Sequence, residues 1–314
     1  MTEVRYHPTD RMVRGTHPTG RAVFRLVLVL ALIALAVTAT LAQRSRRGYG
    51  DRRGYYDDRR GVPDWQVDKE FSRDVFTFVR IRYSSGDGGG YGRYGRSRGG
   101  YGYGPGGGNW ATDYPDSDLN FSYRLHQLTS MEVDPDGLVL ELTDPELVNY
   151  PFIYMLECGR LVFSEEEVEA LRRYLLNGGF VLVDDFWGDA QWENFYEQIK
   201  RVFPDREPQE LDISDPIFHT VFDLKEKPQV PSIDSAIAGR PYGVTWEDHG
   251  PGSETPHFKA LYDDKGRMMA IICHNTDLGD GWEREGEDEW YFHEFSEKKA
   301  YPMGINIVVY AMTH

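Results

Sequence analysis

The chain has 314 residues, 40% of them hydrophobic, which is enough for the core of one good domain with further segments attached. Its formal charge is −16, but residues 1–62 carry 12 Arg and no Lys against 5 acids, so residues 63–314 sum to −23. A globular part this acidic has no electrostatic reason to bind nucleic acid or anionic lipid, and we expect neither as a partner.

An uncharged apolar run, Leu26–Ala42, is preceded by Arg11, Arg14, Arg21 and Arg25. It is short for a membrane-spanning helix and long for the apolar region of a signal peptide. Small residues at Thr40 and Ala42 suit a signal peptidase, whereas arginines follow at once, so two interpretations stay open. Residues 1–42 are a cleaved signal peptide, or residues 26–42 are a membrane anchor. Either predicts an exported, periplasmic or otherwise extracytoplasmic protein that meets the membrane only through this segment.

Two polar stretches contain no apolar periodicity. Residues 43–72 begin with Arg, Gly and Tyr and predict a disordered linker, and in residues 86–108 glycine fills 13 of 23 positions. Arg and Tyr between glycines also occur in RNA-binding segments, where they stack on bases. Export and the acidic domain favour a flexible insertion instead. The predicted organisation is therefore residues 1–42, a linker at 43–72, and a domain at 73–314 with an insertion at 86–108.

The domain alternates strand and helix patterns. Asp74–Tyr83 has strand composition, a helix-like segment runs from Ser117 to Leu128, and 138–142 and 152–156 predict two more strands. Ser164 and Glu167 form a capping box that begins a helix, which ends at Asn177-Gly178. The apolar strand of residues 178–188 and a second helix follow. This rhythm predicts an α/β domain with a mostly parallel sheet and helices on both faces.

The C-terminal part is less regular. Lys259–Tyr262 and Met268–Cys273 predict a hairpin joined by the turn 263–266. Residues 301–312 are apolar nearly all round, which favours a buried terminal helix, with a strand as the alternative.

Three groups of residues could carry chemistry. Asp184 and Asp185 end an apolar strand just before Trp187, at the carboxyl edge where parallel sheets bind ligands. Neighbours on a strand point to opposite faces, so one acid could cap the following helix while the other faces the cleft. A second group is the pair Arg80 and Arg82 of the first strand with Asp113 after the insertion, in which Arg82 and Asp113 are ligand-binding candidates. Arg82, near the strand end, could clamp an anionic ligand, or it could pair with a nearby acid.

The third group is a loop that leaves the strand 268–273. His274 could act as a general base or a metal ligand, and Asp277 could orient it. The plainer interpretation is a turn-rich loop whose Asn and Asp side chains bond their own backbone. The density of polar and aromatic residues favours a binding or catalytic loop, with four further ligand-binding candidates: Asn275, Asp277, Asp280 and Trp282.

Familiar motifs are absent from the sequence. No HExxH, CxxC pair or EF-hand spacing occurs, and there is no P-loop, GxSxG elbow or dinucleotide fingerprint, so we predict no metal site and no cofactor. The two cysteines, Cys158 and Cys273, could pair in an exported protein, but two small buried thiols are the favoured interpretation. A nucleophilic Cys158 with His274 as its base has no local support.

Several blocks of the sequence occur together in order, and as a set the chain resembles the Domain of Unknown Function 4159 family. They include FTFVRIRY, WATDYPDSDLNF, LVFSEEEVEALRRYLLNGGFVLVDDFWG, HNTDLGDGWE and KKAYPMGINIVVYAMTH. The resemblance implies a bacterial protein with a flavodoxin-like, glutamine amidotransferase-like three-layer sandwich, and no established activity. In amidotransferases a Cys follows a central strand, whereas VLVDDFWG has none, which argues against thiol-based amide hydrolysis. IICHNTD is similar to their His-bearing strand.

Two functions remain in view. We favour an exported, non-catalytic domain that binds a small ligand or a protein partner at the strand carboxyl ends. The alternative is a hydrolase, metal-assisted or not, in which Asp184 or Asp185 works with His274.

Overall fold

The computed structural model describes residues 59, 61–68, 74–83 and 109–314, and its compact unit runs from Arg59 to His314. The predicted signal or anchor at 1–42 and the insertion at 86–108 lie outside the described residues. In the described part of the chain, no helix combines the length and the apolar character that a membrane span requires.

Within the described residues, seven strands form one sheet in the order β2-β1-β3-β4-β7-β6-β5. The first five in this order are parallel, β6 runs antiparallel to β7, and β5 runs antiparallel to β6. The bounds are β1 Val79–Arg82, β2 Leu138–Glu141, β3 Phe152–Leu156, β4 Phe180–Asp184, β5 Gln209–Glu210, β6 His257–Tyr262 and β7 Met268–His274. The predicted mostly parallel sheet is confirmed.

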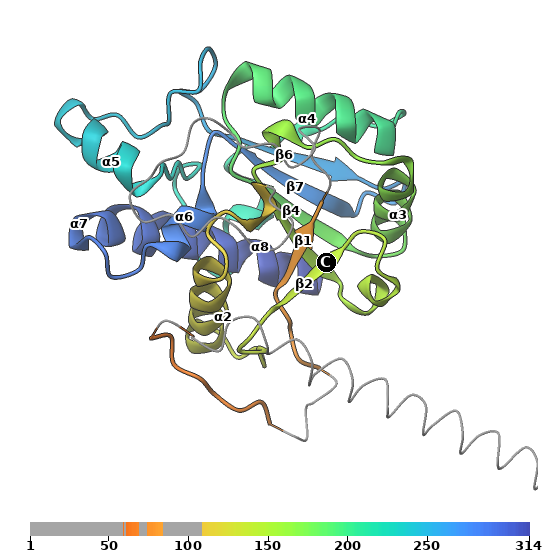
Figure 1. Ribbon diagram of the computed structural model, residues 1–314, viewed down its shortest axis with the longest axis horizontal. Helices are drawn as coiled ribbons and strands as arrows, with labels where there is room; N and C mark the ends of the chain where they lie inside the picture. The colour runs from red at the N-terminus through yellow and green to blue at the C-terminus, as the bar shows by residue number, and fades with distance from the viewer. Residues whose placement is uncertain (1–58, 60, 69–73, 84–108) are drawn as a thin grey trace, which may run out of the picture. The chain divides into compact units, whose positions relative to one another are not determined.

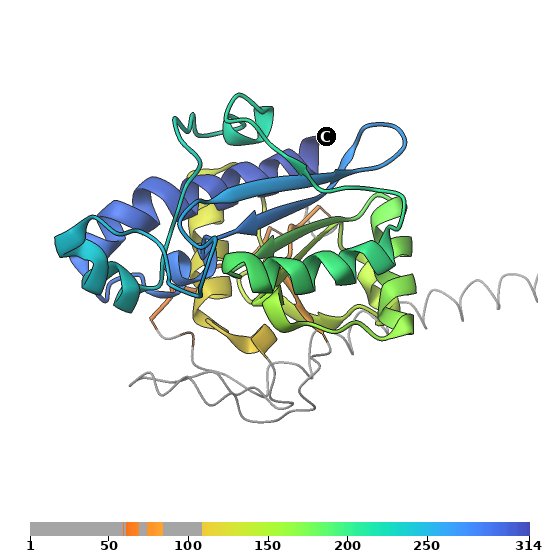
Figure 2. The ribbon, with the colours of Figure 1, turned by 90° about the horizontal axis from the view of Figure 1, so that it is seen from above.

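Helices cover both faces of this sheet (Figure 1). Figure 2 shows the sheet between α8 on one side and α4 on the other. The α-helices are α2 Asp116–Leu128, α3 Glu165–Leu176, α4 Gly188–Val202, α5 Ile233–Gly239, α6 Leu278–Glu283, α7 Glu289–Tyr291 and α8 Tyr301–Thr313. The 3₁₀ helices are η2 Asn109–Ala111, η3 Pro145–Asn149, η4 Cys158–Arg160, η5 Pro216–Phe218 and η6 Arg240–Tyr242, and η7, Phe292–Ala300, is a π-helix.

The apolar runs of the central strands supply two cores, one on each face. Successive strand residues point to opposite faces, so a run such as Phe180–Val183 feeds both layers at once. Phe180 and Leu182 join the core shared with α2, α6 and α8. Val181 and Val183 join the core shared with α3 and α4. This division decides on which side of the sheet each residue at the strand ends emerges.

Most predicted elements are confirmed. The capping box of α3 is present: the Ser164 hydroxyl accepts from the Glu167 amide at 3.2 Å, and the Glu167 carboxylate accepts from the Ser164 amide at 2.8 Å. β3, α3 and β4 form the expected parallel βαβ unit, and β6 and β7 form the expected hairpin. The terminal apolar segment is the helix α8.

One detail differs from the expectation drawn from the sequence, and one expectation about the cysteines is confirmed. Trp65, inside the segment assigned to the linker, donates to the carbonyl of Val133 and stacks on His126, so the chain meets the domain surface before residue 73. The favoured interpretation of the cysteines is confirmed, because both are free and buried. Cys158 lies in the core on the α3 and α4 side and Cys273 in the core on the other side, which keeps the two thiols apart.

Candidate functional site

Three parallel strands end in a polar residue with left-handed backbone. Glu157 follows β3, Asp185 follows β4 and Asn275 follows β7, with φ of 52°, 54° and 62°. Asp113, in the loop between η2 and α2, has φ of 61°. Residues other than glycine rarely adopt this backbone conformation, and those that are held in it gather at functional sites. The chain therefore turns sharply at the edge of the sheet where α/β proteins bind ligands.

Five acidic side chains meet at this edge and are called here the carboxylate cluster: Asp113, Asp185, Asp277, Asp280 and Glu283. They form two triads, Asp113–Asp185–Asp277 and Asp113–Asp280–Glu283, in each of which the three oxygen atoms lie within 4.8 Å of one another. The four aspartates are buried and Glu283 is half-buried. Asp113 belongs to both triads and so lies at the centre of the cluster.

Arg80 of β1 fixes the loop that carries Asp113. Its guanidinium is fully buried and donates to the carbonyls of Trp110 and Thr112 at 3.0 and 2.9 Å. It also forms a buried ion pair with Asp118 of α2. Because this one side chain bonds both ends of the loop, it sets the position of Asp113 without itself joining the cluster.

The short helix α6 presents three members of the cluster. Asp277 is its N-cap and accepts a hydrogen bond from the amide of Asp280 at 2.7 Å. Residues three apart lie on the same side of a helix, so Asp280 and Glu283 follow Asp277 along one face. The Asp-rich segment 277–283, which the sequence alone could present as a simple turn, therefore places three carboxylates in a row.

Asp184 and Asp185 have different surroundings. The Oδ2 atom of Asp184 accepts from the Tyr154 hydroxyl at 3.1 Å and from the amides of Leu278 and Gly279 at 2.9 and 3.1 Å. Asp184 therefore caps α6, whereas the sequence pointed to the helix that follows it, α4. Asp185 instead belongs to the cluster, in agreement with the expectation that one acid of the pair caps a helix and the other faces the ligand edge.

Electrostatics in the cluster favour added protons or an added cation. Burial raises the pKa of Asp113 well above its ordinary value, and the carboxylates of Glu283 and Asp280 raise it further. Burial also raises the pKa of Asp185 and of Asp277 well above the usual range, with neighbouring carboxylates adding to it. Burial brings the pKa of Glu283 to about 7. The cluster therefore disfavours carrying several negative charges at once, and it retains protons that the same carboxyl groups would release in water.

Trp187 and Asn275 support the site through hydrogen bonds within the chain. The indole of Trp187 donates to Asp185 Oδ1 at 3.1 Å. The Asn275 amide accepts from the Gly188 amide and donates to the carbonyls of Gly252 and Thr255. With its side chain occupied in this way, Asn275 ties the 249–255 loop to the start of α4.

His274 emerges on the other face of the sheet. Its neighbour Ile272 packs into the α3 and α4 core, and alternation carries His274 to the same side. Its Nε2 bonds the carbonyl of Gly188 at 3.1 Å, and its ring lies 4.9 Å from that of Phe186. Burial lowers the pKa of His274 to about 4. None of its hydrogen bonds in the described part of the chain goes to Asp185 or to Asp277.

Two other predicted ligand-binding residues also lie apart from the cluster. Arg82 is half exposed and pairs with Glu141 on the neighbouring strand, which is the structural alternative for this side chain. Trp282 is fully buried and packs on Phe121 and Tyr154, so it belongs to the core.

Glu283 and Glu157 are acids of this region that sequence reasoning did not single out. Glu283 follows Asp280 by one helical turn, and that spacing could have drawn attention to it. Glu157 directly follows a fully buried strand, as Asp185 does, and burial raises its pKa to about 7. The position directly after a buried strand, which Glu157 shares with Asp185, is the signal that could have drawn attention to Glu157.

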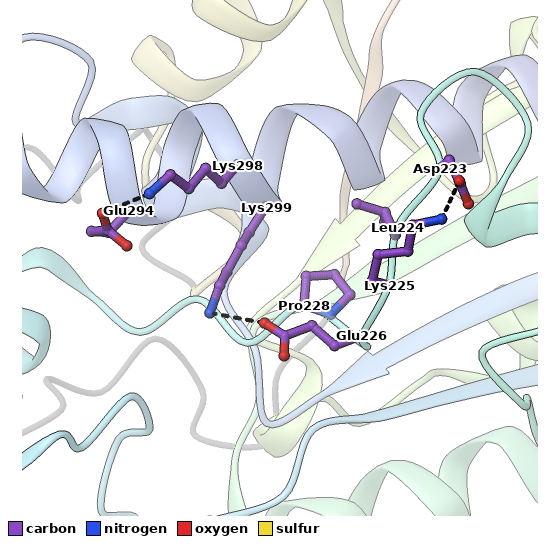
Figure 3. A pocket seen from close by; sticks show the side chains of 8 residues that line it. All are labelled: Asp223, Leu224, Lys225, Glu226, Pro228, Glu294, Lys298 and Lys299. Atoms are coloured by element: carbon purple, nitrogen blue, oxygen red, sulfur yellow. Dashed lines mark hydrogen bonds and ion pairs between the residues drawn. The ribbon is translucent and has the colours of Figure 1, made fainter.

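A surface hollow of about 440 Å³ lies elsewhere, between residues 223–228 and η7 (Figure 3). Its charged side chains are paired with one another: Lys225 with Asp223, Lys298 with Glu294, and Lys299 with Glu226. None of its lining residues belongs to the carboxylate cluster.

The fold and the site together define an α/β domain with a buried group of carboxylates at the strand carboxyl ends. The chain belongs to the family described as Domain of unknown function (DUF4159), whose model matches residues 98–312. The match covers both triads of the cluster and all strands except β1. A comparison with curated proteins finds no match.

Proposed function

We propose that this protein is an exported binding domain that holds a cationic ligand at the carboxylate cluster. One observation carries the proposal. Asp113 is 6% exposed, and its Oδ2 atom has no hydrogen-bond partner among the described residues, although it lies in the midst of other acids. A buried polar atom without a partner is costly, and a bound cation would remove that cost.

The cationic side chains of the described residues do not neutralise the whole cluster. Arg80 is already paired with Asp118. Arg284 contacts Asp280 and Glu283, which leaves Asp113, Asp185 and Asp277 without an ion pair among the described residues. A ligand that brings positive charge would compensate them.

Binding fits the site better than thiol catalysis does. In the amidotransferase-like fold that the sequence suggests, the nucleophilic Cys would follow β4, where this chain has Asp185. The thiols it does have are buried, and burial raises the pKa of both Cys158 and Cys273 well above the ordinary value. A reactive cysteine needs the opposite conditions, an exposed position and a lowered pKa.

The metal-assisted hydrolase stays the weaker alternative. It requires Asp184 or Asp185 to share one reactant with His274. The Oδ2 atom of Asp184 is occupied by the amides of α6, and His274 emerges on the opposite face of the sheet from Asp185 and Asp277. Nothing in the surroundings of His274 supports its taking part in chemistry at the cluster.

Export is proposed from the apolar run at 26–42 and the arginines around it. Fusing a reporter enzyme that is active only outside the cytoplasm behind residue 314 tests it. We expect activity, and loss of activity when residues 26–42 are deleted. An inactive fusion that accumulates in the cytoplasm would refute export.

Thermal melting of the purified full chain tests cation binding. The protein is stripped with a chelator and melted with Mg²⁺, Mn²⁺, Ca²⁺ or spermidine, each against NaCl of equal ionic strength. A ligand at 100 times its Kd adds about 2.7 kcal/mol, which raises Tm by roughly 5–10 °C for a domain of this size.

The matched variants are Asp185→Asn and Asp215→Asn. Both remove one negative charge, and Asn is suited to the left-handed backbone at 185 and to the cap at 215. We expect Asp185→Asn to lose the shift and Asp215→Asn to keep it. The proposal is wrong if no cation shifts Tm, or if both variants respond alike.

A further inference from the structure

We infer that the cationic ligand is a pair of divalent metal ions bridged by the carboxylate of Asp113. The inference rests on the proposed function, because it names the class of cation that the same cluster would hold. It starts from the sharing of Asp113 between the two triads.

Each triad has the dimensions of a single metal site. Mg²⁺ and Ca²⁺ bind oxygen at about 2.0–2.6 Å, so one ion can touch oxygens that lie up to roughly 4–5 Å apart. The oxygens of each triad lie within 4.8 Å of one another. Each triad can therefore surround one ion without movement of the backbone.

Asp113 has an oxygen atom whose lone pairs are available to a metal ion, as a bridging carboxylate requires. Its Oδ2 atom accepts no hydrogen bond from the described residues. A carboxylate has two oxygens, and in two-metal sites such a group spans ions about 3.5–4 Å apart. Asp113 can thus serve the ion beside Asp185 and Asp277 with one oxygen and the ion beside Asp280 and Glu283 with the other.

Gly279 keeps this space clear. A Cβ atom at this position would lie 2.6 Å from Asp113 Oδ2 and 3.4 Å from Asp277 Oδ1. The same Cβ would also lie 2.8 Å from the Tyr154 hydroxyl, so any side chain at 279 would displace the carboxylate of Asp113 from its confined position.

The ligand set indicates which metals fit. All five members of the cluster offer carboxylate oxygen, and neither triad contains a His or a Cys. Oxygen ligands alone suit hard cations, namely Mg²⁺, Mn²⁺ and Ca²⁺, and disfavour metals that prefer imidazole or thiolate.

The two sites should differ in strength. Arg284 contacts both Asp280 and Glu283, at 3.3 and 2.7 Å, and must withdraw before a second ion binds there. No cation of the described chain occupies the triad of Asp185 and Asp277 in this way. The first ion should therefore bind beside Asp185, and the second, more weakly, beside Glu283.

Mn²⁺ titration of the full chain, followed by electron paramagnetic resonance, tests the inference. We expect two Mn²⁺ per chain at saturation, with the spectrum of two coupled ions. Asp113→Asn should abolish the coupling, and Asp185→Asn should weaken the tighter site by at least about 10–100-fold. Melting curves without metal verify that each variant is folded.

Two further variants separate the sites. Glu283→Gln should remove only the weaker ion. Arg284→Gln should tighten that ion by at least about ten-fold, because a competing positive charge next to the site is lost. Asp215→Asn is the control and should bind as the unaltered chain does.

The other outcomes are distinguishable. One Mn²⁺ per chain at saturation, unaffected by Glu283→Gln, overturns the bridged pair but leaves cation binding intact. A melting shift with spermidine that Asp185→Asn abolishes, without Mn²⁺ binding, overturns the metal inference alone. No response to any cation overturns both this inference and the proposed function.

Discussion

Glu210, at the antiparallel edge of the sheet, accepts hydrogen bonds from Lys227, Lys259 and His257. The carboxylate cluster, at the carboxyl ends of the parallel strands, gathers five acids, and the buried guanidinium of Arg80, which acts on Asp113 electrostatically, is already paired with Asp118. Burial would raise the pKa of Glu210, but these hydrogen bonds outweigh it and hold the pKa below the usual range. Among the described residues, the chain supplies counter-charge to Glu210 at the edge, whereas Asp113, Asp185 and Asp277 of the cluster have no ion pair.

The largest expected effect concerns the buried arginine that positions the cluster. Arg80→Gln leaves Asp118 buried without its ion pair and frees the loop that carries Asp113. We expect a loss of about 3–5 kcal/mol in the free energy of unfolding, measured by urea denaturation, together with loss of the cation-induced melting shift.

Arg82→Gln is the matched control for Arg80→Gln. The two arginines lie on the same strand, but Arg82 pairs with Glu141 at the surface. Arg82→Gln should lower the free energy of unfolding by at most about 1 kcal/mol and leave the cation-induced melting shift unchanged. Equal costs for the two variants would show that the buried pair does not organise the site.

The elements of the fold could be predicted because each depends on a local pattern. Ser164 and Glu167 begin α3 through their own backbone contacts, and the apolar run before Asp184 can only be a buried strand after such a helix. Apolar periodicity along the chain is the same quantity that decides burial in the sheet, so sequence and structure agree here.

The assembly of the site could not be predicted in the same way. Asp113, Asp185 and Asp277 come from three separate loops, so no fixed spacing marks them as a triad. Their meeting depends on strand order, which brings β4 between β3 and β7. His274 failed to join them because one residue of shift along β7 changes the face of the sheet, and the sequence does not show which face is which.

The next effect concerns His274, which lies between the two regions. Its ring stacks on His257, the neighbour of Glu210, and it bonds Gly188 at the start of α4. Its pKa of about 4 is below the ordinary 6.5, so folding favours the neutral ring. The contribution of the neutral ring to the free energy of unfolding is fully present above pH 6.5. It declines as the pH falls below 6.5 and is lost as the pH falls through 4, a decrease of up to about 3 kcal/mol.

His274→Gln tests this by urea denaturation at pH 7 and pH 4. Glutamine can still donate to the Gly188 carbonyl but does not titrate, so the variant should lose less stability on acidification than the unaltered chain. His293→Gln, at an exposed histidine, should not reduce the loss. An acid loss that His274→Gln leaves unchanged would place the titrating group elsewhere.

The smallest effect tests the comparison itself, because neutralising one acid in each region should change stability in opposite directions. Asp185→Asn removes a carboxylate repelled by its neighbours and keeps an oxygen for Trp187, so the metal-free chain should gain about 1–2 kcal/mol at pH 7.5. Glu210→Gln removes the acceptor shared by two lysines at a partly exposed position and should cost about 0.5–1 kcal/mol.

Salt separates these two changes further. The cost of Glu210→Gln should shrink in 1 M NaCl, since exposed ion pairs are screened, whereas the gain from Asp185→Asn should persist because buried charges are screened much less. If Asp185→Asn destabilises the metal-free chain, then the chain already compensates its cluster with its own groups. In that case both regions carry compensated carboxylates, and the argument that the cluster requires a bound cation fails.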